Sequence, residues 1–178
     1  MSRWEVRLCI DDFDKSKIIR DNTFSLVEVK NKSFRIRDYE KDVKYICKSI
    51  DNRLEDWDGK PSLEVAKERL NTISNIFLFY HSLESKAIGW CWYTESMTHD
   101  WITTSHKLPT KNSCYAGGMY IRKDINIPPT SGEQLYYHVL SNLLCRYKWV
   151  YGYADSWNRP SIYLANRCRF TPYNFIKE

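Results

Sequence analysis

The chain contains no long apolar stretch. None of its apolar runs approaches the roughly 20 residues that a helix needs to cross a bilayer. The segment from Met1 to Glu5 also lacks the apolar centre of a signal peptide. These absences exclude a helical membrane protein and argue against a secretory leader, so we expect a cytoplasmic protein without a membrane partner.

Paired cysteines and linker-like segments are also missing. The six cysteines lie far apart, with no Cys-x-x-Cys pair and no histidine at metal-ligand spacing. We therefore expect reduced, mostly buried thiols and no metal site. No low-complexity stretch divides the 178 residues, which favours one main domain. We expect residues 1–33 to form an extension packed on a domain that spans residues 34–178.

The charge is weakly biased and the aromatic content is high. The formal net charge is +5, and 15% of the residues are aromatic. This mixture suits a surface that meets anions, either the phosphates of a nucleotide-like ligand or a nucleic acid, although a solvated surface would look the same. The basic residues behind the nucleic-acid hypothesis are Arg35, Arg37, Lys41 and Lys44.

Hydrophobic periodicity predicts alternating strands and helices. Apolar alternation and short apolar runs predict strands at residues 4–10, 24–30, 34–36, 75–81, 87–95, 114–122, 149–155 and 170–176. Helical spacing predicts helices at residues 39–50, 61–73, 131–147 and 159–167. Residues 96–112 show neither period, and so long a loop is often a substrate loop or lid. The order of elements predicts a mixed α/β fold with a central sheet.

The last predicted helix carries a family pattern. Asn158, Ser161, Leu164 and Phe170 stand at the positions where the GNAT acyltransferases have Asn, a small residue, Leu and Phe. With the order of elements, residues from Phe34 to the C-terminus resemble this family. The resemblance implies a mixed central sheet that is splayed between its fourth and fifth strands, with helices on both faces.

The resemblance also implies an acyl donor, acetyl-CoA or another acyl-CoA. In the family, a glycine-rich loop opens the third helix, and its backbone N–H groups hold the pyrophosphate. Only Gly132 is available for that loop here, while Ile127 and Thr130 stand at its other two motif positions. The donor's arm would pair with the fourth strand, where Gly117 and Gly118 would mark a bulge. The implied donor-binding residues are Met119, Tyr120, Ile121, Arg122, Thr130, Ser131, Gly132, Glu133, Gln134, Leu135 and Asn158.

The catalytic residues are less clearly indicated. Many family members have a tyrosine one position after the helix leucine, which protonates the departing thiolate, but Ala165 stands there. Tyr163 is a candidate substitute, although it projects about 200° away around the helix. Glu95 at the end of the third strand and Asp100 in the following loop are candidate bases, each with a simpler interpretation as a solvated residue. The loop histidines at 99 and 106 are weaker candidates, and so is a thiol route through Cys114.

Three functions remain open on this sequence. The first is an acyl-CoA-dependent N-acyltransferase that transfers an acyl group, most simply acetyl, to an amine on a small molecule or macromolecule. The second is a protein that modifies or binds nucleic acid on the same fold. The third is a catalytically silent interaction module, which the loss of tyrosine at Ala165 and the eroded glycine loop would explain.

Overall fold

The computed structural model describes residues 2–20, 22–29, 75–84, 87–95, 111–121 and 128–177. The predicted strand at 34–36, the predicted helices at 39–50 and 61–73, and most of the predicted loop at 96–112 lie outside these residues. Among the described residues, no helix is long and apolar enough to cross a membrane.

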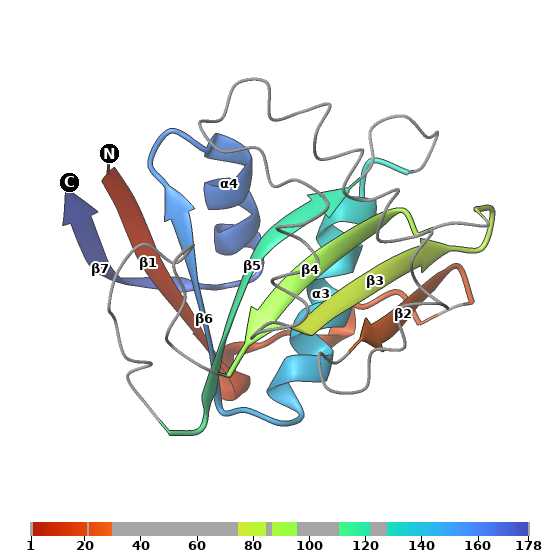
Figure 1. Ribbon diagram of the computed structural model, residues 1–178, viewed down its shortest axis with the longest axis horizontal. Helices are drawn as coiled ribbons and strands as arrows, with labels where there is room; N and C mark the ends of the chain where they lie inside the picture. Colours follow the sequence, from red (N-terminus) through yellow and green to blue (C-terminus); the bar gives the residue numbers. More distant parts are fainter. Residues whose placement is uncertain are drawn as a thin grey trace.

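The described elements follow the predicted order closely (Figure 1). The strands are β1 (Ser2–Cys9), β2 (Phe24–Val29), β3 (Asn75–His81), β4 (Gly89–Thr94), β5 (Ser113–Ile121), β6 (Trp149–Asp155) and β7 (Thr171–Lys177). The helices are α3 (Ser131–Leu144) and α4 (Arg159–Arg167), and η1 (Ile10–Asp12) and η2 (Lys15–Lys17) are short 3₁₀ turns. The helix α3 ends three residues earlier than predicted, because the N–H groups of Arg146 and Tyr147 both turn back to the carbonyl of Leu143.

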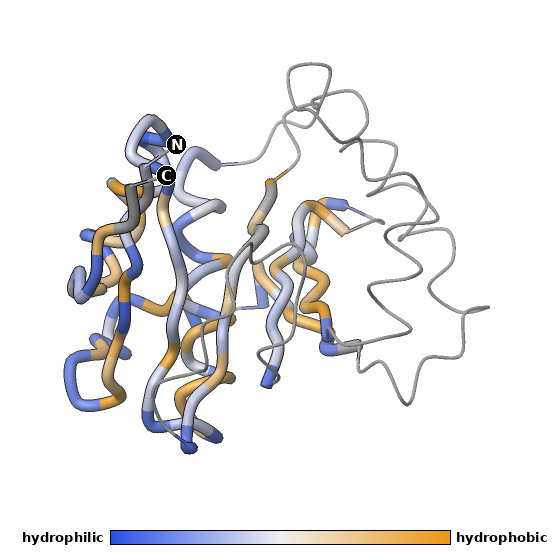
Figure 2. Tube along the Cα trace, turned by 60° about the vertical axis from the view of Figure 1, so that its left-hand side comes forward, coloured by the Kyte–Doolittle hydropathy of each residue, from blue (hydrophilic) through white to orange (hydrophobic). Residues whose placement is uncertain are grey.

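All seven strands form one sheet in the order β2-β3-β4-β5-β6-β1-β7. The first two strands, which come from the predicted extension 1–33, are integral to this sheet. β1 lies between β6 and β7 and pairs antiparallel with both, whereas β2 forms the opposite edge beside β3. The N- and C-terminal strands therefore lie side by side (Figure 2). The division at residue 33 itself lies outside the described residues.

The predicted splay is present between β5 and β6, the fourth and fifth strands of the family pattern. These two strands are parallel, and their register covers only Ser113 to Tyr115 against Trp149 to Tyr151. Beyond Tyr115 they diverge (Figure 1). The remaining edge of β5 that faces β6 therefore lacks a ladder partner among the described strands.

The bulge that the paired glycines predicted is also confirmed. Trp90 of β4 pairs with Tyr120, but Trp92, two residues on, pairs with Gly117. Three steps on β5 thus oppose two steps on β4, so β5 holds one extra residue between these two pairs.

The core lies mainly between the sheet and α3. Leu135, Val139 and Leu143 of α3 are almost fully buried against the sheet. The helix α4 joins the same core through Ala165, and the hydroxyl of Tyr137 in α3 donates to the carbonyl of Arg167 at 3.0 Å. The opposite face of the sheet is buried as well, because its side chains are at most 4% exposed at four positions: Ile76, Leu78, Trp90 and Trp92.

Candidate functional site

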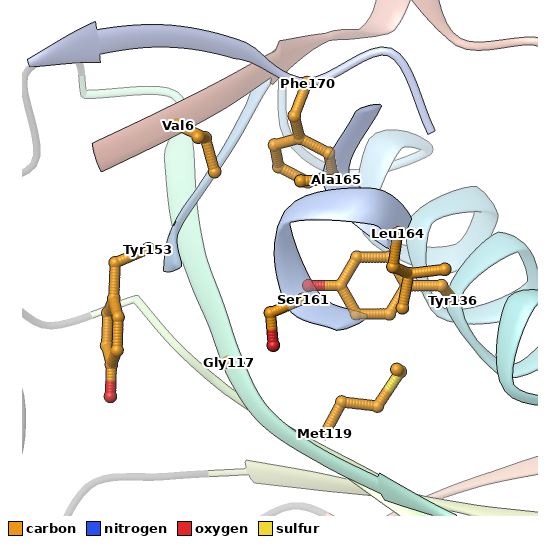
Figure 3. Close-up of a pocket in the computed structure, with 9 residues that line it drawn as sticks. All are labelled: Val6, Gly117, Met119, Tyr136, Tyr153, Ser161, Leu164, Ala165 and Phe170. Carbon is orange, nitrogen blue, oxygen red and sulfur yellow. The ribbon is translucent and has the colours of Figure 1, made fainter. Parts of the chain in front are cut away.

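A hollow of about 70 Å³ lies where β5 and β6 separate (Figure 3). It has room for several water-sized groups. Side chains of β1, β5, β6, α3 and α4 surround it, together with the residue before β7. The lining residues are Val6, Gly117, Met119, Tyr136, Tyr153, Ser161, Leu164, Ala165 and Phe170.

Two glycines shape the strands around this hollow. A Cβ atom on Gly152 would lie 3.1 Å from the carbonyl oxygen of Ala116, so glycine allows β6 to approach β5 closely just before the splay. A Cβ atom on Gly117 would lie 3.0 Å from the ring of Tyr115. The missing side chain at Gly117 therefore leaves space for that ring beside the hollow.

The hollow is lined from both faces of the sheet. Tyr136, Ser161 and Ala165 reach it from the helices on one face. Tyr153 belongs to the opposite face, where its ring stacks on Tyr115 with centroids 5.9 Å apart. Figure 3 shows the Tyr153 side chain on the far side of β5 and β6 from α4. A ligand entering from the helix side could therefore meet a second molecule that approaches from the other side.

The N-terminus of α3 provides unpaired donors. Thr130 makes no side-chain capping bond to the helix. Within the described ranges, the Ser131 hydroxyl is buried without a hydrogen-bond partner, and the backbone N–H groups of Gly132 and Glu133 meet no acceptor. Such N–H groups and the helix dipole favour an anion. Among the described residues, a Cβ atom on Gly132 would lie within 4 Å of Ile121 alone, at 3.9 Å, so these residues leave the approach to this terminus open.

Several predicted donor-binding side chains are engaged within the protein instead. The Gln134 amide accepts from the N–H of Ile19 at 2.9 Å and donates to the carbonyl of Lys17 at 3.1 Å. Leu135 is fully buried in the core. Asn158 caps α4 by accepting from the N–H of Ser161 at 3.3 Å.

The remaining predicted donor-binding residues are placed as follows. Met119 lines the hollow, and Ile121 contacts the start of α3. The Glu133 carboxylate pairs with Arg167 at 3.2 Å, which offsets its negative charge at the helix N-terminus. Only the strand position of Tyr120 is described, and Arg122 lies outside the described residues.

The two catalytic candidates that lie within the described residues, Glu95 and Tyr163, do not line the hollow. Glu95 accepts a hydrogen bond from Tyr147, just after α3 ends, whereas the open donors lie where the helix begins. A helix of this length spans about 20 Å. Tyr163 is 62% exposed and does not line the hollow. Asp100 lies outside the described residues, as do the loop histidines and the basic residues that motivated the nucleic-acid hypothesis.

Two further predictions concern cysteine chemistry. Cys114 is fully buried, and burial raises the pKa of its thiol far above the usual value. A buried, protonated thiol is a poor nucleophile, so the covalent thiol route lacks support. Among the described residues, no group of three or more potential ligands could hold a metal ion.

Sequence reasoning missed two tyrosines that line the hollow, Tyr136 and Tyr153. Tyr136 falls on the apolar side of the amphipathic helix, where its residue type indicates core. Tyr153 alternates with the apolar residues of β6. Neither pattern shows that the neighbouring strands separate at this level, and that separation exposes both rings to one hollow.

Solved structures with the same fold include several GNAT acetyltransferases. A GCN5-related N-acetyltransferase from Sphaerobacter thermophilus aligns with a TM-score of 0.66 and 11% identity over 98% of this chain and 49% of its own. A tandem GNAT protein from the clavulanic acid biosynthesis pathway aligns with a TM-score of 0.58 and 12% identity, over 98% of this chain and 51% of its own. An aminoglycoside acetyltransferase from an uncultured soil metagenomic sample, in complex with sisomicin, aligns with a TM-score of 0.60 and 14% identity. The alignment covers 89% of this chain and 95% of the acetyltransferase.

These identities are low, and they show the fold alone. The chain spans only about half the length of the first two proteins. No protein-family model matches the chain, and no curated protein matches it. The predicted fold class, a mixed α/β sheet of the GNAT type, is confirmed.

Proposed function

Because the chain has the GNAT fold, we propose that it is an acyl-CoA-dependent N-acyltransferase that transfers an acetyl or other acyl group to an amine. The observation that carries the proposal is the hollow at the splay of β5 and β6, which is lined from both faces of the sheet. In this arrangement the acyl donor lies on the helix side and the amine approaches from the side of Tyr153. Direct attack then needs no covalent enzyme intermediate.

The start of α3 suits the phosphate end of the donor. The unpaired Ser131 hydroxyl and the N–H groups of Gly132 and Glu133 are hydrogen-bond donors at the positive end of the helix dipole. The open space beside Gly132 allows a phosphate to approach the backbone. Arg167 neutralises Glu133, which would otherwise repel the phosphate. These residues fit a pyrophosphate, although only Gly132 remains of the usual glycines.

The free edge of β5 suits the donor's extended arm. Past Tyr115 its backbone groups face the splay without a partner strand among the described residues. An extended chain of amides can pair with such an edge as an added strand would. The bulge between Gly117 and Tyr120 interrupts the ladder with β4. A backbone N–H freed there would donate to the carbonyl that the amine attacks.

When bound, an acyl-CoA supplies an acyl group activated as a thioester. The residues of the chain must then hold the carbonyl, accept a proton from the amine and protonate the sulfur that leaves. We retain Asp100 as the proposed base, acting directly or through water. Glu95 is less suitable because its carboxylate accepts a hydrogen bond from Tyr147, which lies just past the C-terminal end of α3.

The side of the hollow that faces the acceptor is aromatic. Tyr153 lines the hollow there and stacks on the buried Tyr115, and its ring favours an amine with a flat or hydrophobic body. Tyramine is a probe with such a body, and spermidine, sisomicin and a lysine peptide are comparison amines that lack it. The free thiols of all five described cysteines are consistent with the expected cytoplasmic setting.

A calorimetric titration with acetyl-CoA and free coenzyme A tests the proposal first. We expect saturable binding of both compounds, with adenosine as a weaker-binding control because it lacks the phosphates and the arm. Release of free thiol from acetyl-CoA in the presence of each amine probe then tests transfer. Absence of binding by either coenzyme A compound would contradict the proposal.

A catalytically silent module is the second candidate, and the alanine in the hollow at position 165 favours it. A silent module would bind coenzyme A or nothing, and would release no thiol with any amine. Measurable acyl transfer to any amine excludes this candidate.

A further inference from the structure

The family's usual tyrosine is absent from α4, but a tyrosine hydroxyl still enters the same hollow. Ala165 lines the hollow and is only 8% exposed. Tyr136 enters the hollow from α3 and packs near Phe170, with ring centroids 6.1 Å apart. Figure 3 shows the Tyr136 ring reaching beneath α4, with its hydroxyl end toward Ser161. A small side chain at Ala165 leaves this volume to the ring from α3.

The Tyr136 hydroxyl is available for a ligand. It makes no hydrogen bond to any residue in the described ranges. It is also absent from the set of side-chain atoms that are both sealed from solvent and unpaired. Its oxygen therefore contacts the open space of the hollow, while its ring is fixed against the core. A hydroxyl held in this way is ready to donate without first breaking another bond.

The geometry points to Tyr136 as the general acid of the acyl transfer, replacing the tyrosine that Ala165 has lost. This inference rests on the proposed function. The amine nitrogen bonds to the carbonyl carbon, and the bond between that carbon and sulfur breaks. The sulfur takes the phenolic proton, so that free thiol leaves. The amine's proton passes to the base or to water, and the phenolate regains a proton from solvent.

The surroundings of Tyr136 keep its hydroxyl protonated until the sulfur leaves the carbonyl carbon. Burial raises the pKa of Tyr136 well above its usual value, so the phenol stays protonated at neutral pH. A thiolate formed in the same hollow would also become more basic. Burial raises the pKa of the nearby thiols of Cys91 and Cys168 to about 12. Burial therefore raises the pKa of both groups, so the leaving thiolate becomes a stronger base while the phenol becomes a weaker acid.

The other hydroxyls of the hollow are less suitable donors. Ser161 also lines it on the helix side, but an aliphatic hydroxyl is a much weaker acid than a phenol. Tyr153 lies on the opposite face, beside Tyr115, where the amine would approach. Tyr163 is exposed on α4 and does not line the hollow. Tyr136 is thus the phenol that reaches the hollow from the donor's side.

The decisive variant is Tyr136→Phe, which removes one unpaired hydroxyl and keeps the ring. We expect its unfolding transition to match that of the wild type, since no protein hydrogen bond is lost. A bound thiolate that accepts a hydrogen bond from Tyr136 should bind about tenfold more tightly than one that does not. Calorimetry with free coenzyme A over a pH series that ionises its thiol should therefore show a tenfold deficit for Tyr136→Phe, confined to alkaline pH. Tyr173→Phe on β7 is the matched control and should behave like the wild type.

Transfer kinetics supply the second measurement. With acetyl-CoA and the best amine probe, we expect Tyr136→Phe to lower kcat by about a hundredfold with little change in KM. The double variant Tyr136→Phe with Ala165→Tyr places the phenol on α4 instead of α3. Its kcat should recover at least about a tenth of the rate lost in Tyr136→Phe. Ser161→Ala should keep most of the wild-type kcat.

The outcomes separate the two proposals. If the wild type binds no coenzyme A, both are overturned. If it binds, and Tyr136→Phe matches it in alkaline affinity, the assignment of Tyr136 is overturned while the proposed function stands. If the wild type binds coenzyme A but transfers no acyl group, the affinities at alkaline pH still decide whether Tyr136 donates to the sulfur.

Discussion

The backbone N–H of Phe170 donates to the carbonyl oxygen of Ala165 at 2.9 Å, and this bond closes the C-terminus of α4. The N–H of Arg169 donates to the carbonyl of Asn166 at 3.0 Å. Together these bonds form a Schellman motif, which requires a left-handed residue between them. Arg169 occupies that position with a φ of 63°. Arginine carries a Cβ atom that disfavours this conformation, whereas glycine adopts it freely.

We expect Arg169→Gly to stabilise the protein by about 0.5–1 kcal/mol. Glycine adopts the left-handed conformation without a steric penalty, and this gain exceeds the entropy that it adds to the unfolded chain. The lost ion pair to Asp14, at 3.8 Å on an exposed side chain, contributes little. Urea unfolding measures the change. Arg169→Ala is the control, because it keeps the Cβ and removes only the ion pair, and a gain equal to that of glycine would contradict the explanation.

Elements defined by local signals were predicted well. β3, β6 and α4 have the predicted bounds. The capping side chain of Asn158 and the proline at the start of α4 define that helix within a few residues of sequence. β3 and β6 are short, largely apolar runs with clear ends. The paired glycines likewise predicted the bulge in β5, because a bulge is a local feature of one strand.

Features that depend on distant pairing were not predictable in the same way. Nothing in the alternation of Trp4, Val6 and Leu8 indicates that β1 lies between β6 and β7, which are about 150 residues away. The same limit applies to the hollow. The role of Tyr136 depends on where two strands separate and on a small residue in another helix. Glu95 is another case, since its position at a strand end does not indicate that its carboxylate accepts a hydrogen bond from Tyr147, far along the chain.

We expect Gly132→Leu to fold normally and to lose affinity for acetyl-CoA by at least about tenfold. The space beside Gly132 accepts a Cβ, with Ile121 at an ordinary contact distance of 3.9 Å, but a longer side chain would occupy the path to the unpaired N–H groups of Gly132 and Glu133. Calorimetry measures the affinity, and thermal unfolding checks the fold. Gly132→Ala is the control and should keep most of the affinity. Equal affinity in the wild type and Gly132→Leu would remove α3 from the proposed donor site.

The stability of the protein should fall as the pH rises above about 9. Burial raises the pKa of Cys91, Cys168 and Tyr137 to about 12, whereas unfolding returns these groups to ordinary values of 9.0 for cysteine and 10.0 for tyrosine. Between these limits the unfolded state loses protons that the folded state keeps. Each group then lowers the free energy of unfolding by up to about 1.4 kcal/mol per pH unit.

Urea unfolding from about pH 8 to about pH 10.5 measures this slope, with Cys168→Ala as the comparison. The variant starts less stable because it loses buried volume, but it should lose stability less steeply with pH, since one titrating group is gone. Parallel slopes for the variant and the wild type would show that Cys168 titrates normally in the folded protein.

Arg146 should be the most important charged residue for holding β2 to the rest of the described sheet. Its guanidinium pairs with Glu28 of β2 at 2.8 Å and lies over the ring of Tyr93 at 5.2 Å from the centroid. The hydroxyl of Tyr93 also donates to Glu28, so these three residues join β2, β4 and the end of α3. We expect Arg146→Ala to destabilise the protein by about 1–2 kcal/mol, from a partly exposed ion pair and a cation–π contact. Arg146→Lys should recover less than half, because lysine lacks the planar fork. Urea unfolding gives both values, and hydrogen exchange should show the loss first in the amides of β2. A uniform loss of protection across the sheet would contradict this local role.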